Sequence, residues 1–235
     1  MKGKNSAKSI EMEDVWKKYD MGEVEPLVVL SDINLEIKRG EFVAITGPSG
    51  SGKSTMLNLV GVLDKPSWGR VILDNQNISF LRESDLAILR GKKIGFIFQQ
   101  FNLIKTLSAL ENVMLPMEAL DILSKKESEQ RAIALLTVLG LQDRLHHKPN
   151  QLSGGQQQRV AIARALANDP EIILADEPTG NLDSHTGQFV MEFLQKLNKQ
   201  GKTIILITHD PNLKKYAKRI INIMDGKIIS PPGKK

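Results

Sequence analysis

Residues 47–55 are Gly47-Pro48-Ser49-Gly50-Ser51-Gly52-Lys53-Ser54-Thr55. This stretch matches the Walker A pattern, and it lies between the apolar run Phe42–Ile45 and a helical pattern that begins near Ser54. In such a loop the backbone N–H groups and the N-terminus of the next helix form a concave site for phosphate oxygens. Lys53 adds a mobile positive charge, and the Ser54 hydroxyl suits magnesium. The alternative is a glycine-rich turn without a ligand, and the strand before and the helix after the loop disfavour it.

The composition is typical of a folded chain with a large core. Of its 235 residues, 41% are hydrophobic and 25% are charged, and no apolar run approaches the roughly 18 residues that span a bilayer. No apolar stretch follows the charged first residues, so we expect no secretory signal and a cytosolic protein. The absence of cysteine excludes thiol catalysis, disulfides and thiolate metal sites.

The net charge of +5 raises the question of a nucleic-acid or anionic-membrane partner. The lysines are spread along the chain in short groups, with few aromatic residues between them. These groups are Lys17-Lys18, Lys92-Lys93, Lys125-Lys126 and Lys214-Lys215. We therefore expect a solvated surface and no nucleic-acid partner.

Alternating strand and helix patterns predict an α/β fold. Alternation over residues 33–38 predicts a half-buried antiparallel strand near the N-terminus, after an extended segment that ends near Tyr19. Continuous apolar runs predict strands buried on both faces, which implies a mostly parallel sheet. These runs are residues 41–46, 94–98, 172–175 and 203–208. The last strong signal is a hairpin that turns at Asp225-Gly226.

Residues from about 108 to 168 have helical patterns instead. Ser124 and Glu127 form a plausible capping box, and Gly140 occupies the position of a helix-ending glycine. We therefore expect a single domain over residues 10–235 that contains a helical subdomain at about 100–168. A polar lead, residues 1–9, is expected to lack order.

Polar residues follow four of the predicted strands, at the sheet edge where α/β proteins bind ligands. Besides the loop after Ile45 they are Gln99, the pair Asp176 and Glu177, and His209. A carboxylate after an apolar strand is costly unless it is paired, so Asp176 is a natural magnesium partner, and Glu177 is placed to polarise an attacking water. The alternatives are a helix-capping acidic pair and a structural histidine.

The segment Leu152–Gln156 contains Ser153, Gly154 and Gly155 at the start of a long helical pattern. A helix N-terminus with two glycines and a hydroxyl is a second candidate phosphate site. Taken alone this is a weak signal, and its value comes from its combination with the Walker A loop.

Together these motifs resemble the ATP-binding subunit of ABC transporters, over nearly the whole chain. The matching segments, in the family's order, are Walker A (47–55), the Q-loop at Gln99, the signature (152–156), Walker B (172–177), the D-loop (181–183) and the switch histidine His209. Residues 98–103, 110–113 and 148–153 are similar to the branch of lipoprotein-release, macrolide-export and cell-division ATPases. The implied fold is a P-loop NTPase core with a mostly parallel sheet, an N-terminal antiparallel β subdomain and an inserted helical subdomain.

The resemblance also implies the roles of individual residues. The residues expected at ATP are Tyr19, Gly47, Pro48, Ser49, Gly50, Ser51, Gly52, Lys53, Ser54, Thr55, Ser153, Gly154, Gly155, Gln156 and Asp183. Those expected to act in hydrolysis are Lys53, Gln99, Glu177 and His209, and those expected at Mg²⁺ are Ser54, Gln99 and Asp176. Tyr19 matches the aromatic residue that stacks on adenine, although taken alone it favours a packing role over a stacking one.

The family further implies that two copies enclose two ATP molecules head to tail, with each γ-phosphate between one copy's Walker A and the other's signature. Such a dimer hydrolyses ATP to drive a separate membrane permease from the cytoplasmic face. We expect Phe101, Leu103 and Leu107 near the permease. The alternative is a non-transport ABC ATPase that acts as a DNA-associated or scaffold switch. Only the net positive charge of the chain favours it.

Overall fold

The computed structural model describes residues 8–22 and 25–229. Its chain divides into two compact units. The first unit contains Met1–Ala87 and Asn198–Lys235, and the second contains Ile88–Leu197. The predicted helical subdomain, at about residues 100–168, makes up part of this second unit.

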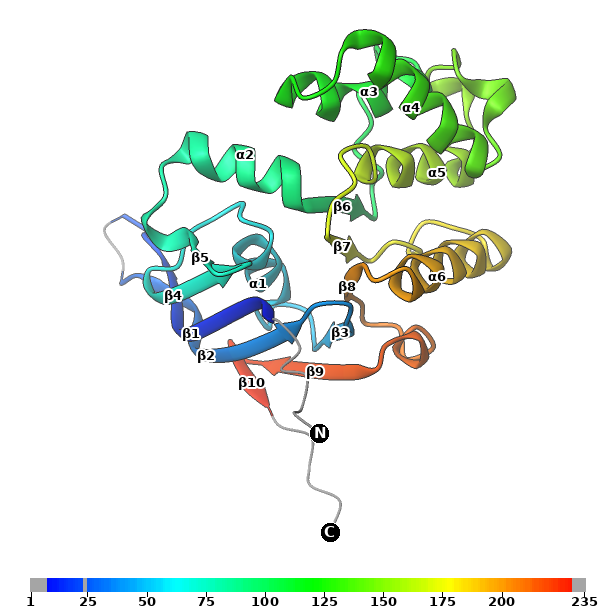
Figure 1. Cartoon of the computed structure of the whole chain (residues 1–235). Helices are drawn as coiled ribbons and strands as arrows, with labels where there is room; N and C mark the ends of the chain where they lie inside the picture. The colour runs from blue at the N-terminus through cyan, green and yellow to red at the C-terminus, as the bar shows by residue number, and fades with distance from the viewer. Residues whose placement is uncertain (1–7, 23–24, 230–235) are drawn as a thin grey trace, which may run out of the picture. The chain divides into compact units, whose positions relative to one another are not determined.

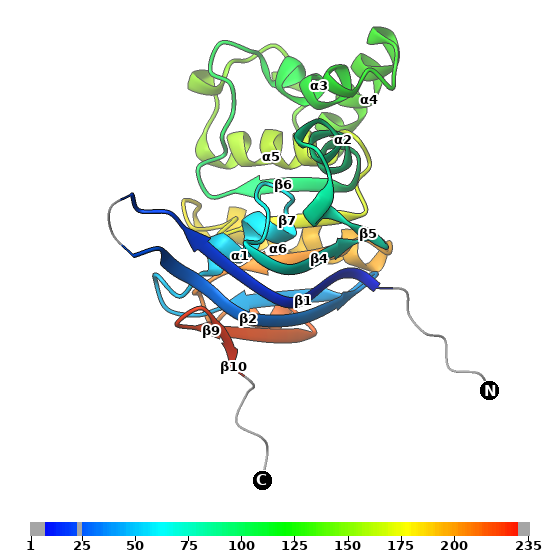
Figure 2. The ribbon, with the colours of Figure 1, turned by 90° about the vertical axis from the view of Figure 1, so that its left-hand side faces the viewer.

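The first unit contains two sheets. Strands β1 (Lys8–Tyr19), β2 (Leu27–Lys38), β4 (Trp68–Leu73) and β5 (Gln76–Asn77) form an antiparallel sheet in the order β2-β1-β4-β5, and Figure 2 shows β1, β2 and β4 side by side. Strands β3 (Phe42–Thr46), β8 (Thr203–Ile207), β9 (Arg219–Met224) and β10 (Lys227–Ile229) follow the order β10-β9-β3-β8. Strand β3 is parallel to β8 and β9, whereas β10 closes an antiparallel hairpin with β9. The remaining elements of this unit are α1 (Lys53–Val60), η1 (Ile78–Phe80), the start of α2 (Glu83–Lys93) and η4 (Lys214–Tyr216).

The core of the first unit follows from the apolar patterns. All five residues of β3 are buried, as its continuous apolar run predicts, and β2 buries alternate residues from Ile33 to Ile37. Helix α1 turns Met56, Leu57, Leu59 and Val60 inward. The hairpin turn has positive φ at Asp225 and Gly226, 48° and 72°, which is the backbone that its sequence favours.

The second unit combines a parallel strand pair with helices. Strands β6 (Ile94–Phe98) and β7 (Ile172–Asp176) pair in parallel. Helices α3 (Ala109–Leu120), α4 (Lys125–Val138) and α5 (Gly154–Ala165) contact one another, as Figure 1 shows. Its other elements are η2 (Gln142–Arg144), η3 (Pro149–Gln151) and α6 (Ser184–Lys199). The Ser124–Glu127 capping box is present, and Gly140 has a φ of 72°, so both predicted ends of α4 are confirmed.

The structure corrects three predicted boundaries. Strand β1 includes Lys8 and Ser9, so the expectation of no order is wrong for these two residues, while residues 1–7 lie outside the described part of the chain. Strand β2 begins at Leu27 rather than at residue 33, because its exposed first residues still pair with β1. The pattern over residues 81–89 predicts a short helix, whereas α2 begins at Glu83 and continues to Lys93, where the basic residues of its last turn suit a helix C-terminus.

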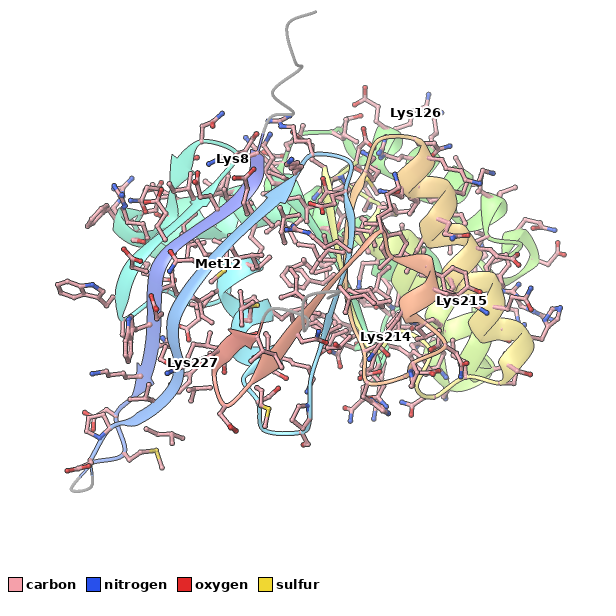
Figure 3. The ribbon with its side chains drawn as sticks, turned by 90° about the horizontal axis from the view of Figure 1, so that it is seen from below. Lys8, Met12, Lys126, Lys214, Lys215 and Lys227 are labelled. Atoms are coloured by element: carbon pink, nitrogen blue, oxygen red, sulfur yellow. The ribbon has the colours of Figure 1, made fainter. Side chains whose placement is uncertain are left out.

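Four described lysines of the first unit lie in three separate elements. Lys8 begins β1, Lys227 begins β10, and Lys214 and Lys215 lie in η4, and Figure 3 shows these three groups at separate places. This distribution agrees with a solvated surface. Within residues 8–22 and 25–229, no helix is long and apolar enough to cross a membrane.

Candidate functional site

The loop after β3 has a shape that requires glycine. A Cβ atom on Gly47 would lie 2.1 Å from the carbonyl oxygen of Ile223, so no other residue fits there without a shift. Gly50 and Gly52 have φ values of 77° and 100°, in the left-handed region that glycine adopts at no steric cost. The loop is therefore a built feature of the backbone, held against the neighbouring strand β9.

This loop suits an anionic ligand. Helix α1 begins after Gly52 and, among the described residues, no side chain caps it, whereas α3, α4 and α5 all have capping boxes. Lys53 Nζ donates to the carbonyl oxygens of Gly47 at 3.0 Å and Pro48 at 2.6 Å, so the ammonium lies over the loop. The Ser51 hydroxyl is buried and has no hydrogen-bond partner within the described residues. First-turn N–H groups, a cation and a spare hydroxyl fit phosphate.

Tyr19, at the end of β1, lies beside helix α1. Its hydroxyl donates to Asp64 Oδ2 at 3.1 Å, and Lys17 Nζ lies 4.9 Å from the ring centroid. Lys17 also donates to Asp64 Oδ1 at 2.6 Å, which completes a triangle of tyrosine, carboxylate and lysine. Burial, and then the bond to Asp64, raises the pKa of Tyr19, while a hydrogen bond with Thr55 acts in the opposite direction. The ring is thus fixed next to the Walker A helix.

His209 lies near the same loop. It follows β8, and the N–H of the preceding Thr208 donates to the carbonyl oxygen of Ile45 at 3.2 Å. Because Ile45 belongs to the strand that leads into the Walker A loop, this bond brings the exposed His209 to the edge of the sheet where that loop begins. The first unit therefore contains Tyr19, residues 47–55 and His209.

The other predicted residues belong to the second unit. Phe98 and Asp176 are register partners in the parallel pair of β6 and β7, so Gln99 and Glu177 follow at the same edge. Glu177 has a φ of 45°, which is uncommon for a residue with a side chain. Its carbonyl oxygen accepts a hydrogen bond from Gly180 N–H at 3.1 Å. Such local strain is typical of functional positions, because the surrounding structure must maintain it.

Gln99 is joined to the segment after Walker B. The Asn181 side chain donates to the carbonyl oxygen of Gln99 at 3.0 Å, and Gln99 Nε2 donates back to Asn181 Oδ1 at 3.5 Å. A Cβ on Gly180 would lie 2.7 Å from Gln99 Nε2, so glycine allows the close approach. The Q-loop glutamine and the D-loop are therefore in direct contact within one chain.

The signature segment begins α5. Ser153 Oγ accepts the N–H of Gln156 at 3.3 Å, and Gln156 Oε1 accepts the N–H of Ser153 at 2.9 Å. This capping box leaves the hydroxyl proton of Ser153 to donate elsewhere, and the N–H groups of Gly154 and Gly155 have no partner within the helix. Ser153 and Gly154 are exposed, so the helix end is open to an anionic group.

Asp183 belongs to the turn that starts α6. Its Oδ1 accepts the N–H of Thr186 at 2.9 Å, and its Oδ2 accepts the Thr186 hydroxyl at 2.7 Å. These bonds from the backbone and the side chain of Thr186 hold the pKa of Asp183 below its usual value. Asp183 is exposed and remains a carboxylate at neutral pH.

Comparison with known proteins decides the family. The model of the family described as "ABC transporter" matches residues 30–180, more than half of the chain. The chain belongs to the ABC transporter ATP-binding family. It is accordingly an ATPase of the ABC class, as the sequence motifs predict.

Individual relatives agree with this assignment. An uncharacterized ABC transporter ATP-binding protein of Methanocaldococcus jannaschii is 57% identical, over 94% of this chain and 97% of the relative. The macrolide export ATP-binding/permease protein MacB of Vibrio parahaemolyticus is 54% identical over 94% of this chain, which spans only 34% of that protein. A solved structure, a dimeric post-hydrolysis state of the ATP-binding cassette MJ0796 bound to ADP and Pi, has a TM-score of 0.86 and 53% identity over 93% of this chain and 96% of that chain.

Three residues of this ABC ATPase escaped the sequence analysis although they hold the motifs in place. Asp64 anchors Tyr19. Gln158 Nε2 donates to the carbonyl oxygen of Pro178 at 2.7 Å, and Arg164 Nη2 donates to the carbonyl oxygen of Phe101 at 2.9 Å. Arg164 interrupts the apolar residues 160–167, which is a signal that it has a specific partner, whereas Gln158 lies in a polar run and no local signal marks it.

The donor set is compatible with magnesium bound together with ATP. The described residues include no group of three or more acidic, histidine or cysteine side chains arranged around a metal position. Mg²⁺ in nucleotide sites is held by one or two carboxylates plus the substrate phosphates, so a dense acidic cluster is not required. Each unit has one predicted donor of this kind, the hydroxyl of Ser54 in the first unit and the carboxylate of Asp176 in the second.

Proposed function

We propose that two copies of this chain enclose two ATP molecules and hydrolyse them to power a membrane permease. The observation that carries the proposal is that one chain has two phosphate-ready helix starts, α1 and α5, in different units. One nucleotide needs the first start from one copy and the second from its partner. The ADP-bound dimeric cassette at 53% identity supports this arrangement.

In this proposal each motif has a chemical task. The Walker A loop and Lys53 bind the phosphates, and Tyr19 stacks on adenine. The signature of the partner copy, through Ser153 and Gly155, stabilises charge on the transferred phosphoryl group. Glu177 accepts a proton from the attacking water, while His209 and Gln99 contact the γ-phosphate region. Magnesium, held by Ser54, Asp176 and Gln99, would offset phosphate charge.

A groove in the second unit supports a permease partner. Its volume is about 520 Å³, and it is lined by Gln100, Phe101, Asn102, Leu103, Lys105, Pro149, Asn150 and Gln157. Phe101 and Leu103, two of the residues expected near a permease, therefore share one groove, whereas Leu107 lines a second groove on α3 and α4. The first groove includes the residues directly after Gln99, so a protein bound there would contact the segment that follows the γ-phosphate sensor.

The relatives named above differ in length. One is an ABC transporter ATP-binding protein of about this chain's length, whereas MacB is a longer ATP-binding/permease protein. We propose that the permease of this ATPase is a separate chain and that the ATPase lies on the cytoplasmic face of the membrane. None of the relatives named above is described as acting on DNA. Purification from membranes with a tag on this chain tests the arrangement, and recovery of the ATPase without any membrane protein would contradict it.

The substitution Glu177→Gln tests the catalytic assignment. It removes the base and keeps the shape, so turnover should fall by about 10²–10⁴. ATP binding should persist, and an ATP-dependent dimer should accumulate in size-exclusion chromatography. Near-normal ATPase activity of this variant would remove Glu177 from the role of base, and a monomer at saturating ATP would contradict the sandwich.

A further inference from the structure

Thr186 is a buried residue in an exposed segment. It lies in the first turn of α6 and is 8% exposed, whereas Asp183, Ser184 and His185 before it are all exposed. A polar residue that the fold buries at such a place has specific partners. Its partners are two functional motifs that are far apart in the sequence.

The first partner is the D-loop carboxylate. Thr186 supplies both of the hydrogen bonds described above, one from its backbone N–H and one from its hydroxyl, to the two oxygens of Asp183. The hydroxyl bond, at 2.7 Å, also selects one orientation of the β-branched Thr186 side chain. Asp183 and Thr186 are therefore fixed relative to each other.

The second partner is the signature glycine. A Cβ on Gly155 would lie 2.8 Å from Thr186 Cγ2 and 3.1 Å from Thr186 Oγ1. The backbone of Gly155 thus rests directly on the Thr186 side chain, at a separation that leaves no room for any larger residue. Thr186 Oγ1 therefore donates to the D-loop carboxylate, and Oγ1 and Cγ2 both lie beside the backbone of Gly155.

Other contacts of the second unit continue this connection. Asn181 and Gly180, in the same loop, contact Gln99, and Gln158 of α5 holds the carbonyl oxygen of Pro178. The segment from Walker B to α6 is therefore tied to the Q-loop at Asn181 and to the signature helix at Pro178. Thr186 adds a third contact of this segment, with Gly155 at the start of the signature helix.

We propose that Thr186 is a positioning residue that fixes the signature Gly155 and the D-loop Asp183 as one unit, so that both reach the partner copy's nucleotide in a single arrangement. This inference rests on the proposed ATP sandwich and names a residue that the motifs do not include. It has a physical basis, because reacting groups that are misplaced by about 1 Å lose about 10²-fold in rate. Thr186 itself does not touch ATP.

Two near-isosteric variants separate the two contacts. Thr186→Val keeps the volume beside Gly155 but removes the hydroxyl bond to Asp183, and Thr186→Ser keeps the hydroxyl but removes Cγ2. We expect Thr186→Val to weaken the ATP-dependent dimer, measured in the Glu177→Gln background, by about tenfold or more, because a hydrogen bond to a charged group is lost. When Thr186→Val is made in the chain that keeps Glu177, kcat should fall, while the affinity of the monomer for a fluorescent ATP analogue should stay unchanged.

A pH profile distinguishes positioning from packing. Removal of the hydroxyl bond in Thr186→Val should raise the pKa of Asp183. As the pH is lowered, the ATP-dependent dimer of this variant should therefore be lost at a higher pH than the dimer of the parent chain. The matched control is Thr203→Val. Thr203 is also buried, and its hydroxyl accepts the N–H of Gly40 at 3.0 Å, away from both motifs. This control should lower the melting temperature but leave unchanged both the dimer affinity and the pH at which the dimer is lost on acidification.

A double substitution tests the contact with the signature directly. Gly155→Ala adds the Cβ that overlaps Thr186 and should reduce dimer affinity by more than tenfold. Thr186→Ser removes the nearest overlapping atom, so Gly155→Ala/Thr186→Ser should recover several-fold over Gly155→Ala alone. Gly155→Ala/Thr186→Val, in which valine has a methyl group at both γ positions, should not recover.

The outcomes separate this inference from the proposed function. If the Glu177→Gln chain forms no dimer with ATP, the sandwich itself fails. If that dimer forms, parental affinity in Thr186→Val, or a double variant no better than Gly155→Ala alone, overturns the role of Thr186. If Thr186→Val misfolds and its monomer no longer binds ATP, the role of Thr186 is decided by the dimer affinity of Gly155→Ala/Thr186→Ser compared with that of Gly155→Ala alone.

Discussion

At the scale of single residues, the ring of Tyr19 is held in place by its neighbours. Asp64 accepts its hydroxyl and Lys17 lies over one side of its ring, so the ring cannot rotate freely. A fixed ring loses little entropy when adenine stacks on it. We expect Tyr19→Ala to raise the KM for ATP about tenfold, since stacking on an aromatic residue contributes about 1–3 kcal/mol per base, with little change in kcat.

The matched control for this prediction is Tyr19→Phe, which keeps the ring and loses the bond to Asp64. Its KM should stay within a few-fold of the parent value, because stacking depends on the ring face rather than on the hydroxyl. Steady-state ATPase assays measure both variants. Equal KM values in Tyr19→Ala and the parent chain would reassign Tyr19 to packing.

The ionisation of Tyr19 gives a second prediction at this scale. The chain has two tyrosines, so Tyr216→Phe leaves Tyr19 as the only phenol. Burial and Asp64 raise its pKa, and the phenolate absorbance should therefore titrate above the ordinary value of about 10. Because the folded pKa is raised, the associated stability is complete below about pH 10 and is lost as pH rises through the folded pKa. A midpoint at or below 10 would contradict this environment.

At the scale of elements, two capping boxes that share the same pair of backbone bonds allow a comparison. Ser124 caps α4 and Ser153 caps α5 in this way, and the Ser124 hydroxyl also donates to the Glu127 carboxylate. Replacement of either serine by alanine should cost about 1 kcal/mol, which lowers the melting temperature by about 2–4 °C in a chain of this size. Scanning calorimetry measures both variants.

The two variants should differ in function. Ser153→Ala removes a hydroxyl proposed to contact the partner's nucleotide, so it should also weaken the ATP-dependent dimer in the Glu177→Gln background. Ser124→Ala should leave that dimer intact. A similar loss of dimer affinity in both variants would mean that helix stability, rather than the signature hydroxyl, is responsible.

The same elements show what could be predicted from the sequence. Period-two alternation at Ile33–Ile37, the apolar run of β3 and the Ser124 capping box are local signals, and each produced the expected element. The partners of Gln99 and Tyr19 are 82 and 45 residues away, at Asn181 and Asp64. No local pattern encodes such pairs, because they depend on how strands and loops are brought together in the fold.

The motifs can be recognised in the sequence, but the contacts between them depend on the tertiary structure. Glycines in the Walker A loop and the signature are visible as residues, but the reason for each is its neighbour in the fold. Gly47 lies against Ile223 and Gly155 lies against Thr186, and neither neighbour belongs to a motif. A residue such as Thr186 is therefore found only after the chain is folded.

At the scale of the whole molecule, the proposed dimer makes a prediction about mixed copies. Each ATP site would combine one copy's Lys53 with the partner's Gly155, by two-fold symmetry. Lys53→Ala and Gly155→Glu should each abolish ATPase activity in pure dimers. In their equal mixture, a hybrid dimer has one site with both residues intact, so activity should return to about a quarter of the parent value, since half of the dimers are hybrids with one working site of two.

The decisive control mixes the parent chain with the double variant Lys53→Ala/Gly155→Glu. This mixture contains the same substitutions, but in its hybrid dimers every composite site has lost one of its two residues, so hybrid formation should lower activity below that of the parent chain alone. If each chain completed its own site, the results would be reversed: the parent chain would keep its activity in the hybrids, and the mixture of single variants would stay inactive. Colorimetric phosphate release, with hybrid content measured by two different affinity tags, therefore determines whether hydrolysis needs residues from both copies.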